Sequence, residues 1–300
     1  MNTNAPSFRG LYHMVTACED QSAYRHCMLP WQSQAQAAMQ VLRRYGELEA
    51  RTWFINPAYD FDTGIVRRED VYNSYNLYAL SRLSDILLLS YQLNRQNEEW
   101  TGPSVTLDER TEWFTSLGMT LIEERAFCPF YHEIVEVEQA PEADERITLL
   151  DTIWPGFMLN HLLFCRAGVR VRGGVQHIRK ELAETSTLCQ TFWRNNRPTD
   201  DASHGWGHNS QWATTFRRDY VDATMYYYNV DGEYDLSPGA KNRRDDMREI
   251  LDEQRLTVTG MIELVRHRCF VVTDKDNSEG GLWPDPFKYS EPRSTWSAHR

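Results

Sequence analysis

Apolar side chains recur at helical spacing through the first 125 residues. They lie three and four positions apart over residues 33–50 and again over 68–94, where they are so frequent that both sides of the helix are expected to be covered. Thr106 is followed three residues later by Glu109, a capping-box pattern that opens a helix extending to about Arg125. We therefore predict three helices in this part of the chain.

The pattern changes at Phe127. Residues 131–138 alternate between apolar and acidic side chains, and a second apolar run over 147–150 follows a turn, so the two together predict an antiparallel hairpin. Two further apolar runs, 157–167 and 175–194, are interpreted as helices. Gly168 is expected to end the first, and a pair of glycines directly precedes the second.

The last third is more varied. Residues 195–209 are polar and contain glycine, which indicates a loop, and 216–230 are rich in aromatic residues that favour extended structure. A long helix is predicted over 241–270. The segment 273–300 is rich in proline, serine and charge, and we expect it to form an irregular tail on the surface.

These elements predict a mainly α (α+β) fold class. The simplest architecture is one helical globular domain of residues 1–300 with a small antiparallel β element, and no internal repeat is visible. A division into two units near 127–145 is the alternative.

Composition narrows the classes of partner. The 43 acidic residues outnumber the 32 basic ones, and the net charge of -11 disfavours binding to nucleic acid. No apolar run approaches the ~20 residues of a membrane helix, and the N-terminus lacks the pattern of a signal peptide, so we expect a cytoplasmic protein without membrane contact. Six cysteines without a CxxC pair indicate reduced thiols. Nothing in the pattern is typical of a particular oligomeric state.

One segment, 199–220, concentrates polar and aromatic side chains. His204 and His208 would share a face if the segment were helical, but the two glycines between them favour a loop. Glycines allow close approach of the backbone to a ligand, so the segment is typical of a small-molecule pocket. The candidate catalytic residues are His204, His208 and Asp219. The candidate substrate-binding residues are Trp206, Asn209, Gln211, Trp212, Arg217, Arg218 and Tyr220.

Within this segment, Arg217 and Arg218 could bind a carboxylate in bidentate fashion, although adjacent residues of a strand point to opposite faces and at most one should face the pocket. The alternative is that one of them pairs with Asp219 and the other is solvated. The whole segment could also be a structural corner, with its tryptophans packed into the core and its histidines bonded to backbone carbonyls.

A metal site is a further hypothesis. His132, Glu136 and Glu138 would share one face of a strand, and together with His204 and His208 they would offer nitrogen and oxygen ligands suited to iron, zinc or manganese. The alternative is a solvated acidic face. His267 could hold haem as an axial ligand, or it could simply interact with the dipole at a helix C-terminus.

Two classes of function follow. The first is an enzyme that modifies a small polar substrate, anionic or resembling an amino acid, with imidazole as general base or metal ligand and an arginine as binding group; iron, zinc or haem would make it an oxidoreductase. The second is an acidic binding or immunity-type protein with an aromatic interface. Tryptophans in a concave pocket would favour the first class, and tryptophans on an open face the second.

Overall fold

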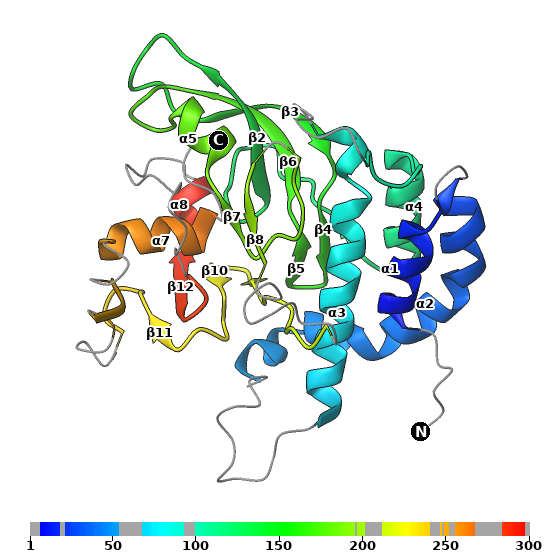
Figure 1. Ribbon diagram of the computed structural model, residues 1–300. Helices are drawn as coiled ribbons and strands as arrows, with labels where there is room; N and C mark the ends of the chain where they lie inside the picture. Colours follow the sequence, from blue (N-terminus) through cyan, green and yellow to red (C-terminus); the bar gives the residue numbers. More distant parts are fainter. Residues whose placement is uncertain are drawn as a thin grey trace.

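The structure is a computed structural model that describes residues 7–18, 22–53, 68–92, 100–195, 197–201, 212–240, 247, 249–251, 256–267 and 284–297. In this part of the chain 40% of the residues are helical and 23% lie in strands, which form one seven-stranded and two smaller sheets. The fold is therefore mixed α/β, and the prediction of a mainly α fold with a small β element was wrong. Figure 1 shows α1 to α4 gathered on one side of the sheets, with α7 and α8 on the other.

The N-terminal third is helical, and α2, α3 and α4 overlap the three predicted helices, whereas α1 was not predicted. Its α-helices are α1 (Phe8–Thr16), α2 (Leu29–Leu42), α3 (Arg68–Ile86) and α4 (Leu107–Ser116). Short π and 3-10 turns connect them: η1 (Tyr24–Met28), η2 (Arg43–Gly46), η3 (Leu48–Thr52) and η4 (Leu89–Tyr91). At α4 both hydrogen bonds of the predicted capping box are present, although the helix ends well before Arg125.

The strands alternate with short connections through the rest of the chain. The seven-stranded sheet has the order β1-β4-β5-β9-β10-β12-β11. Its strands are β1 (Thr120–Leu121), β4 (Phe157–Leu159), β5 (Leu162–Cys165), β9 (Tyr220–Val221), β10 (Met225–Tyr228), β11 (Tyr234–Asp235) and β12 (Phe287–Pro292). All neighbours are antiparallel except β11 and β12.

A three-stranded sheet replaces the predicted hairpin. The strands β2 (His132–Gln139) and β3 (Thr148–Trp154) form as expected but do not pair with each other, because β6 (Ala167–Gly173) lies between them. It runs parallel to β2 and antiparallel to β3. Gly168 on β6 lies under the Trp154 ring, since a Cβ there would come within 2.1 Å of the indole.

Residues 157–167 are strands rather than the predicted helix. Leu159 pairs with Leu162, so Asn160 and His161 form a two-residue hairpin turn in which Asn160 has a φ of 51°. Asparagine tolerates this left-handed conformation better than most residues, and the run is too short for periodicity to distinguish a strand from a helix.

The predicted later helices are also shorter. Within 175–194 only α5 (Lys180–Thr185) is helical, and β7 (Leu188–Cys189) then pairs with β8 (Thr199–Asp200). Of the predicted helix 241–270 the structure describes α7 (Val258–His267) and the helical residues 247 and 249–251. The tail is not irregular in its described part, which contains β12 and α8 (Ser294–Ser297).

The largest apolar cluster joins the helices to the sheet. It contains Leu80 and Leu83 of α3, Trp113 and Phe114 of α4, and Phe157 of β4. No described helix has both the length and the apolar character needed to cross a membrane. None of the five described cysteines forms a disulfide with another described cysteine. The packing of α3 and α4 against β4 and β5 creates the setting for the site described next.

Candidate functional site

A charged cavity lies where α3, β2, β5 and the segment 212–219 meet. The cavity volume is about 70 Å³. This is enough for a few water molecules or one small polar group. Among the residues that line it are Tyr78, Ser81, Cys165, Gln190, Thr214 and Thr215. Its charged lining residues are Asp85, Glu133, Arg166, Arg194, Asp201, Arg217 and Asp219. Such a density of charge in a concave, mostly buried space is typical of a ligand site.

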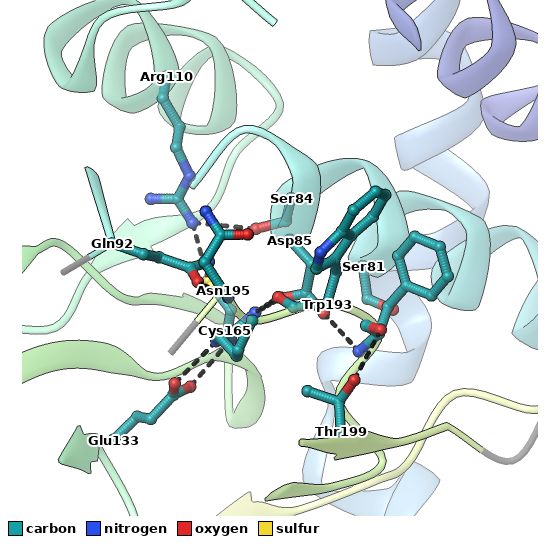
Figure 2. A network of polar contacts seen from close by, with 12 residues as sticks. Ser81, Ser84, Asp85, Gln92, Arg110, Glu133, Cys165, Trp193, Asn195 and Thr199 are labelled. Atoms are coloured by element: carbon teal, nitrogen blue, oxygen red, sulfur yellow. Dashed lines mark hydrogen bonds and ion pairs between the residues drawn. The ribbon is translucent and has the colours of Figure 1, made fainter. Parts of the chain in front are cut away.

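Arg194 forms the best-paired part of this lining, between Asp85 and Glu133, which Figure 2 labels. Its Nε and Nη2 donate to the two carboxylate oxygens of Glu133 at 2.8 and 2.9 Å, and its Nη1 donates to Asp85 Oδ1 at 2.9 Å. The second oxygen of Asp85 accepts the backbone N–H of Phe192 at 2.9 Å. Burial lowers the pKa of Arg194, but the two carboxylates outweigh this effect and the net pKa is raised. Each nitrogen of this guanidinium donates to an oxygen, and the group positions the two acids.

Arg110 of α4 lies near the same site without such pairing. It is completely buried, and its Nη1 donates to the carbonyl of Pro155 at 2.9 Å. Its Nη2 donates to Ser84 Oγ at 2.9 Å and to Cys165 Sγ at 3.4 Å (Figure 2). Among the described residues it makes no ion pair with a carboxylate. Burial lowers the pKa of Arg110, and the nearby groups of Cys165 and Asp85 oppose that effect.

A third group joins two arginines to one carboxylate. Asp219 accepts from Arg166 Nη2 at 3.1 Å and from Arg217 Nε at 2.7 Å, and the backbone N–H of Asn229 donates to it at 2.7 Å. Arg166 Nε donates to the carbonyl of Pro129 at 2.9 Å, whereas its Nη1 is buried and has no partner within the described part of the chain. Burial lowers the pKa of Arg166, against the attraction of Asp219.

The two adjacent arginines of the predicted pocket are separated by the structure. Arg217 lines the cavity, pairs with Asp219, and also donates to Gln190 Oε1 at 3.1 Å. Arg218 does not line it; it is 1% exposed and makes a bidentate pair with Asp231 at 2.8 and 2.6 Å. The interpretation of one arginine paired to Asp219 was correct, but the second is buried rather than solvated.

Tyr220 and Trp212 have structural positions. The Tyr220 hydroxyl is buried and donates to the carbonyl of Tyr45 at 2.5 Å, and burial raises its pKa to about 12. Trp212 is 8% exposed, packs edge-on against Tyr12, and lies under the Arg82 guanidinium at 4.1 Å. Neither residue lines the cavity, so both contribute to the core that supports it.

His132 is bound to the backbone on both sides. Its Nδ1 accepts the N–H of Cys128 at 3.0 Å, and the ring also bonds to the backbone of Glu124. Burial lowers its pKa to about 4. The register of β2 shifts after Ile134, so the expected alternation with Glu136 is lost. These contacts use the ring nitrogens that the predicted metal site required.

The central residues of the predicted pocket lie outside the described residues. They are His204, Trp206, His208, Asn209 and Gln211. Across the ranges that the structure describes, no three His, Cys, Asp or Glu side chains gather as a metal-binding group. His267 is the last residue of α7. The hypothesis of an iron or zinc site therefore stays a prediction that depends on segment 202–211, and the hypothesis of haem stays a prediction that depends on His267.

Charged residues of the site and its surroundings that the sequence interpretation missed share one feature: each interrupts or directly follows an apolar pattern. Arg110 precedes Trp113, Phe114 and Leu117 by three, four and seven positions, so it occupies the apolar stripe of its helix. Arg166 directly follows the apolar strand β5, of which Cys165 is the last residue. A charged residue at a position where the pattern demands an apolar one indicates a buried polar network.

Chemically, the cavity offers a thiol, guanidinium donors, and carboxylates and hydroxyls that can orient a polar ligand. Comparison of the chain with protein-family models, with curated proteins and with solved structures finds no match. The geometry of this cavity is therefore the basis for any statement about function.

Proposed function

We propose that the protein is an enzyme that binds and modifies a small anionic or carboxylate-bearing molecule in the charged cavity. The observation that carries the proposal is the Nη1 of Arg166, a buried donor without a partner among the described residues, on an arginine that lines the cavity. An unmade hydrogen bond of a buried charged group costs about 1–3 kcal/mol or more. A ligand oxygen at this position would remove that cost.

The size and the charge of the cavity support this class of ligand. The accessible space of about 70 Å³ suits a carboxylate, a phosphate or a small amino acid better than a large cofactor. Every nitrogen of the Arg194 and Arg217 guanidiniums donates to a protein oxygen. Arg166 keeps one nitrogen, Nη1, without a partner among the described residues, and it is therefore the recognition group in this proposal. Tyr78 donates to Asp201 at 2.6 Å on the same lining, which places a second polar pair next to the ligand space.

An interaction protein with an aromatic interface is the other class of function. The net charge of -11 is its main support. Trp212, which that hypothesis places on an open face, is buried against Tyr12 and Arg82. The position of Trp212 therefore argues against an aromatic interface at this residue, and it is the core packing that the interpretation as a structural corner expects.

The proposal is tested with a panel of small carboxylates, amino acids and organic phosphates. Each compound is added at constant ionic strength, and the melting temperature is recorded, because a ligand that binds the folded state stabilises it by about 2.7 kcal/mol at one hundred times its Kd. Consumption of any stabilising compound is then followed by proton NMR. We expect at least one anionic compound to raise the melting temperature and to be converted.

Arg166→Lys and Arg218→Lys form a matched pair of variants. Both change a buried, acid-paired arginine, but only Arg166 lines the cavity. Arg166→Lys should weaken binding at least tenfold, while Arg218→Lys should bind like the wild-type protein. Failure of every anionic compound to stabilise the wild type, or equal loss in both variants, would contradict the proposal.

A further inference from the structure

Cys165 differs in its surroundings from the other four described cysteines. It is the last residue of β5, it is half-buried, and it lines the charged cavity. Cys27, Cys128 and Cys189 are buried, and Cys18 is half-buried but lies at the end of α1, away from the cavity lining. Within the described residues, Cys165 is therefore the thiol that a cavity ligand would meet.

The sulfur of Cys165 is bonded to a cation that has no carboxylate partner in the described part of the chain. Arg110 Nη2 donates to Sγ at 3.4 Å, within the range for sulfur acceptors, and its other partners are the neutral oxygens of Ser84 and Pro155 (Figure 2). A fully buried guanidinium that no carboxylate hydrogen-bonds is unfavourable. A cation that donates to the sulfur of a cysteine favours nucleophilic attack by that sulfur.

The second observation points to a ligand beside this sulfur. The unpartnered Nη1 belongs to Arg166, which directly follows Cys165, is 4% exposed and lines the same cavity. The cavity lining thus combines a sulfur bonded to a cation with a buried donor that has no partner among the described residues. This pairing of a nucleophile and an oxygen-binding donor is what covalent catalysis requires.

We propose that Cys165 is the nucleophile of the cavity, activated by Arg110, and that it attacks an electrophilic carbon of a small anionic substrate. The assignment rests on the proposed function in sharing its cavity. In the reaction the Cys165 thiol releases its proton to water, a lone pair of the sulfur forms a new S–C bond, and the bond from that carbon to its leaving group breaks. The leaving group departs with the electron pair and takes up a proton from water. Nothing is oxidised or reduced in this step.

Iodoacetamide tests the nucleophile on the full-length protein without any knowledge of the substrate. The sulfur forms a bond to the methylene carbon and iodide leaves with the electron pair. The rate at each cysteine is followed at pH 7 by mass spectrometry of peptides. We expect Cys165 to react at least tenfold faster than Cys18, although both are half-buried. Equal rates, or a faster Cys18, would overturn the proposal.

Two variants assign the activation to Arg110. Arg110→Met removes the cation and should slow alkylation of Cys165 at least tenfold, and Arg110→Lys should restore part of the rate. Ser84→Ala removes a neutral partner of the same guanidinium and should change the rate less than twofold. An unchanged rate in a folded Arg110→Met protein would refute the role of Arg110. If that variant does not fold, the comparison of Cys165 with Cys18 in the wild type still decides the proposal.

Iodoacetate separates this proposal from the proposed function, because it carries a carboxylate on the same reactive group. If Arg166 binds anions, iodoacetate should react with Cys165 severalfold faster than iodoacetamide does, and Arg166→Lys should abolish that preference. Fast iodoacetamide reaction without a preference for iodoacetate supports the nucleophile and contradicts the anion site. A slow reaction of Cys165 with iodoacetamide contradicts the nucleophile whatever the anion-binding result.

Discussion

Arg194 and Arg110 are two buried guanidiniums near the same cavity, and they are neutralised in different ways. Arg194 is held by the carboxylates of Asp85 and Glu133 in three charge-assisted hydrogen bonds. Arg110 has only neutral oxygens and the sulfur of Cys165 as hydrogen-bond partners in the part of the chain that the structure describes. Both also lie near aromatic rings, Arg194 beside Trp154 and Arg110 beside Phe157.

The difference distinguishes a buried arginine that stabilises the fold from a buried arginine whose charge serves the site. A buried cation with two carboxylates forms a closed unit whose removal leaves unpaired acids in the interior. A buried cation without a carboxylate is more costly to maintain, and such a cost is typical of a site that uses the charge. Four measurements test this comparison.

Arg194→Met is expected to have the largest effect on stability. It leaves Asp85 and Glu133 buried without a counter-ion, and the free energy of unfolding should fall by about 3–5 kcal/mol. Urea denaturation at pH 7 measures it. A loss below about 1 kcal/mol would mean that solvent, rather than Arg194, neutralises the two acids.

His132 represents a third way to bury an ionisable group, because it is neutral in the folded protein. Burial lowers its pKa from 6.5 to about 4. Above pH 6.5 the imidazole is neutral in both states, so its titration costs the folded protein no stability. As the pH falls from 6.5 to about 4, the unfolded chain takes up a proton that the folded protein does not, and the free energy of unfolding decreases. The loss amounts to about 3 kcal/mol at 1.36 kcal/mol per pKa unit.

The contribution of His132 is isolated by comparing the wild type with His132→Gln in urea denaturation between pH 7 and 4. The difference in stability between the two proteins should shrink as the pH falls through this range. Parallel curves would show that other groups cause the acid sensitivity.

Arg110→Met should cost less than Arg194→Met, about 1–2 kcal/mol, because no carboxylate loses its partner. The flexible methionine side chain retains apolar contact near Phe114 and Phe157, and the loss comes from the carbonyl of Pro155 and the hydroxyl of Ser84. Urea denaturation of both variants under one condition compares them. Equal losses would remove the distinction between the two arginines.

Arg170→Met is the surface reference and should have the smallest effect. Arg170 pairs with Asp151 at 2.6 Å, but the two side chains are 41% and 48% exposed. Water and salt screen such a pair, so the urea midpoint should not change within experimental error. A clear loss would indicate that pairing alone, and not burial, determines the cost of breaking these contacts.

The local elements follow closely from the sequence. The capping box of Thr106 and Glu109 forms as predicted, and α2 and α3 overlap the predicted helices 33–50 and 68–94. Helix caps and helical periodicity depend on residues within a few positions of each other, which is why they can be interpreted without the fold.

The candidate site was only partly predictable. Arg217 and Asp219 line the cavity, but Asp85, Arg110 and Cys165 belong to segments where they interrupt an apolar pattern. Their sequence separations from one another are too large for any local rule to join them. They meet because α3 and α4 pack on β4 and β5, and a prediction of helix over 157–167 precludes that arrangement.

The acidic net charge, most of the helical N-terminal third and the strand character of β2 can be predicted from the sequence, because composition and short-range periodicity are sufficient for each of these. Tertiary structure alone decided that β6 lies between β2 and β3 and that Cys165 meets Arg110. Strand pairing satisfies backbone groups with a partner remote in sequence, and a buried charge finds its counter-group only once distant segments have packed.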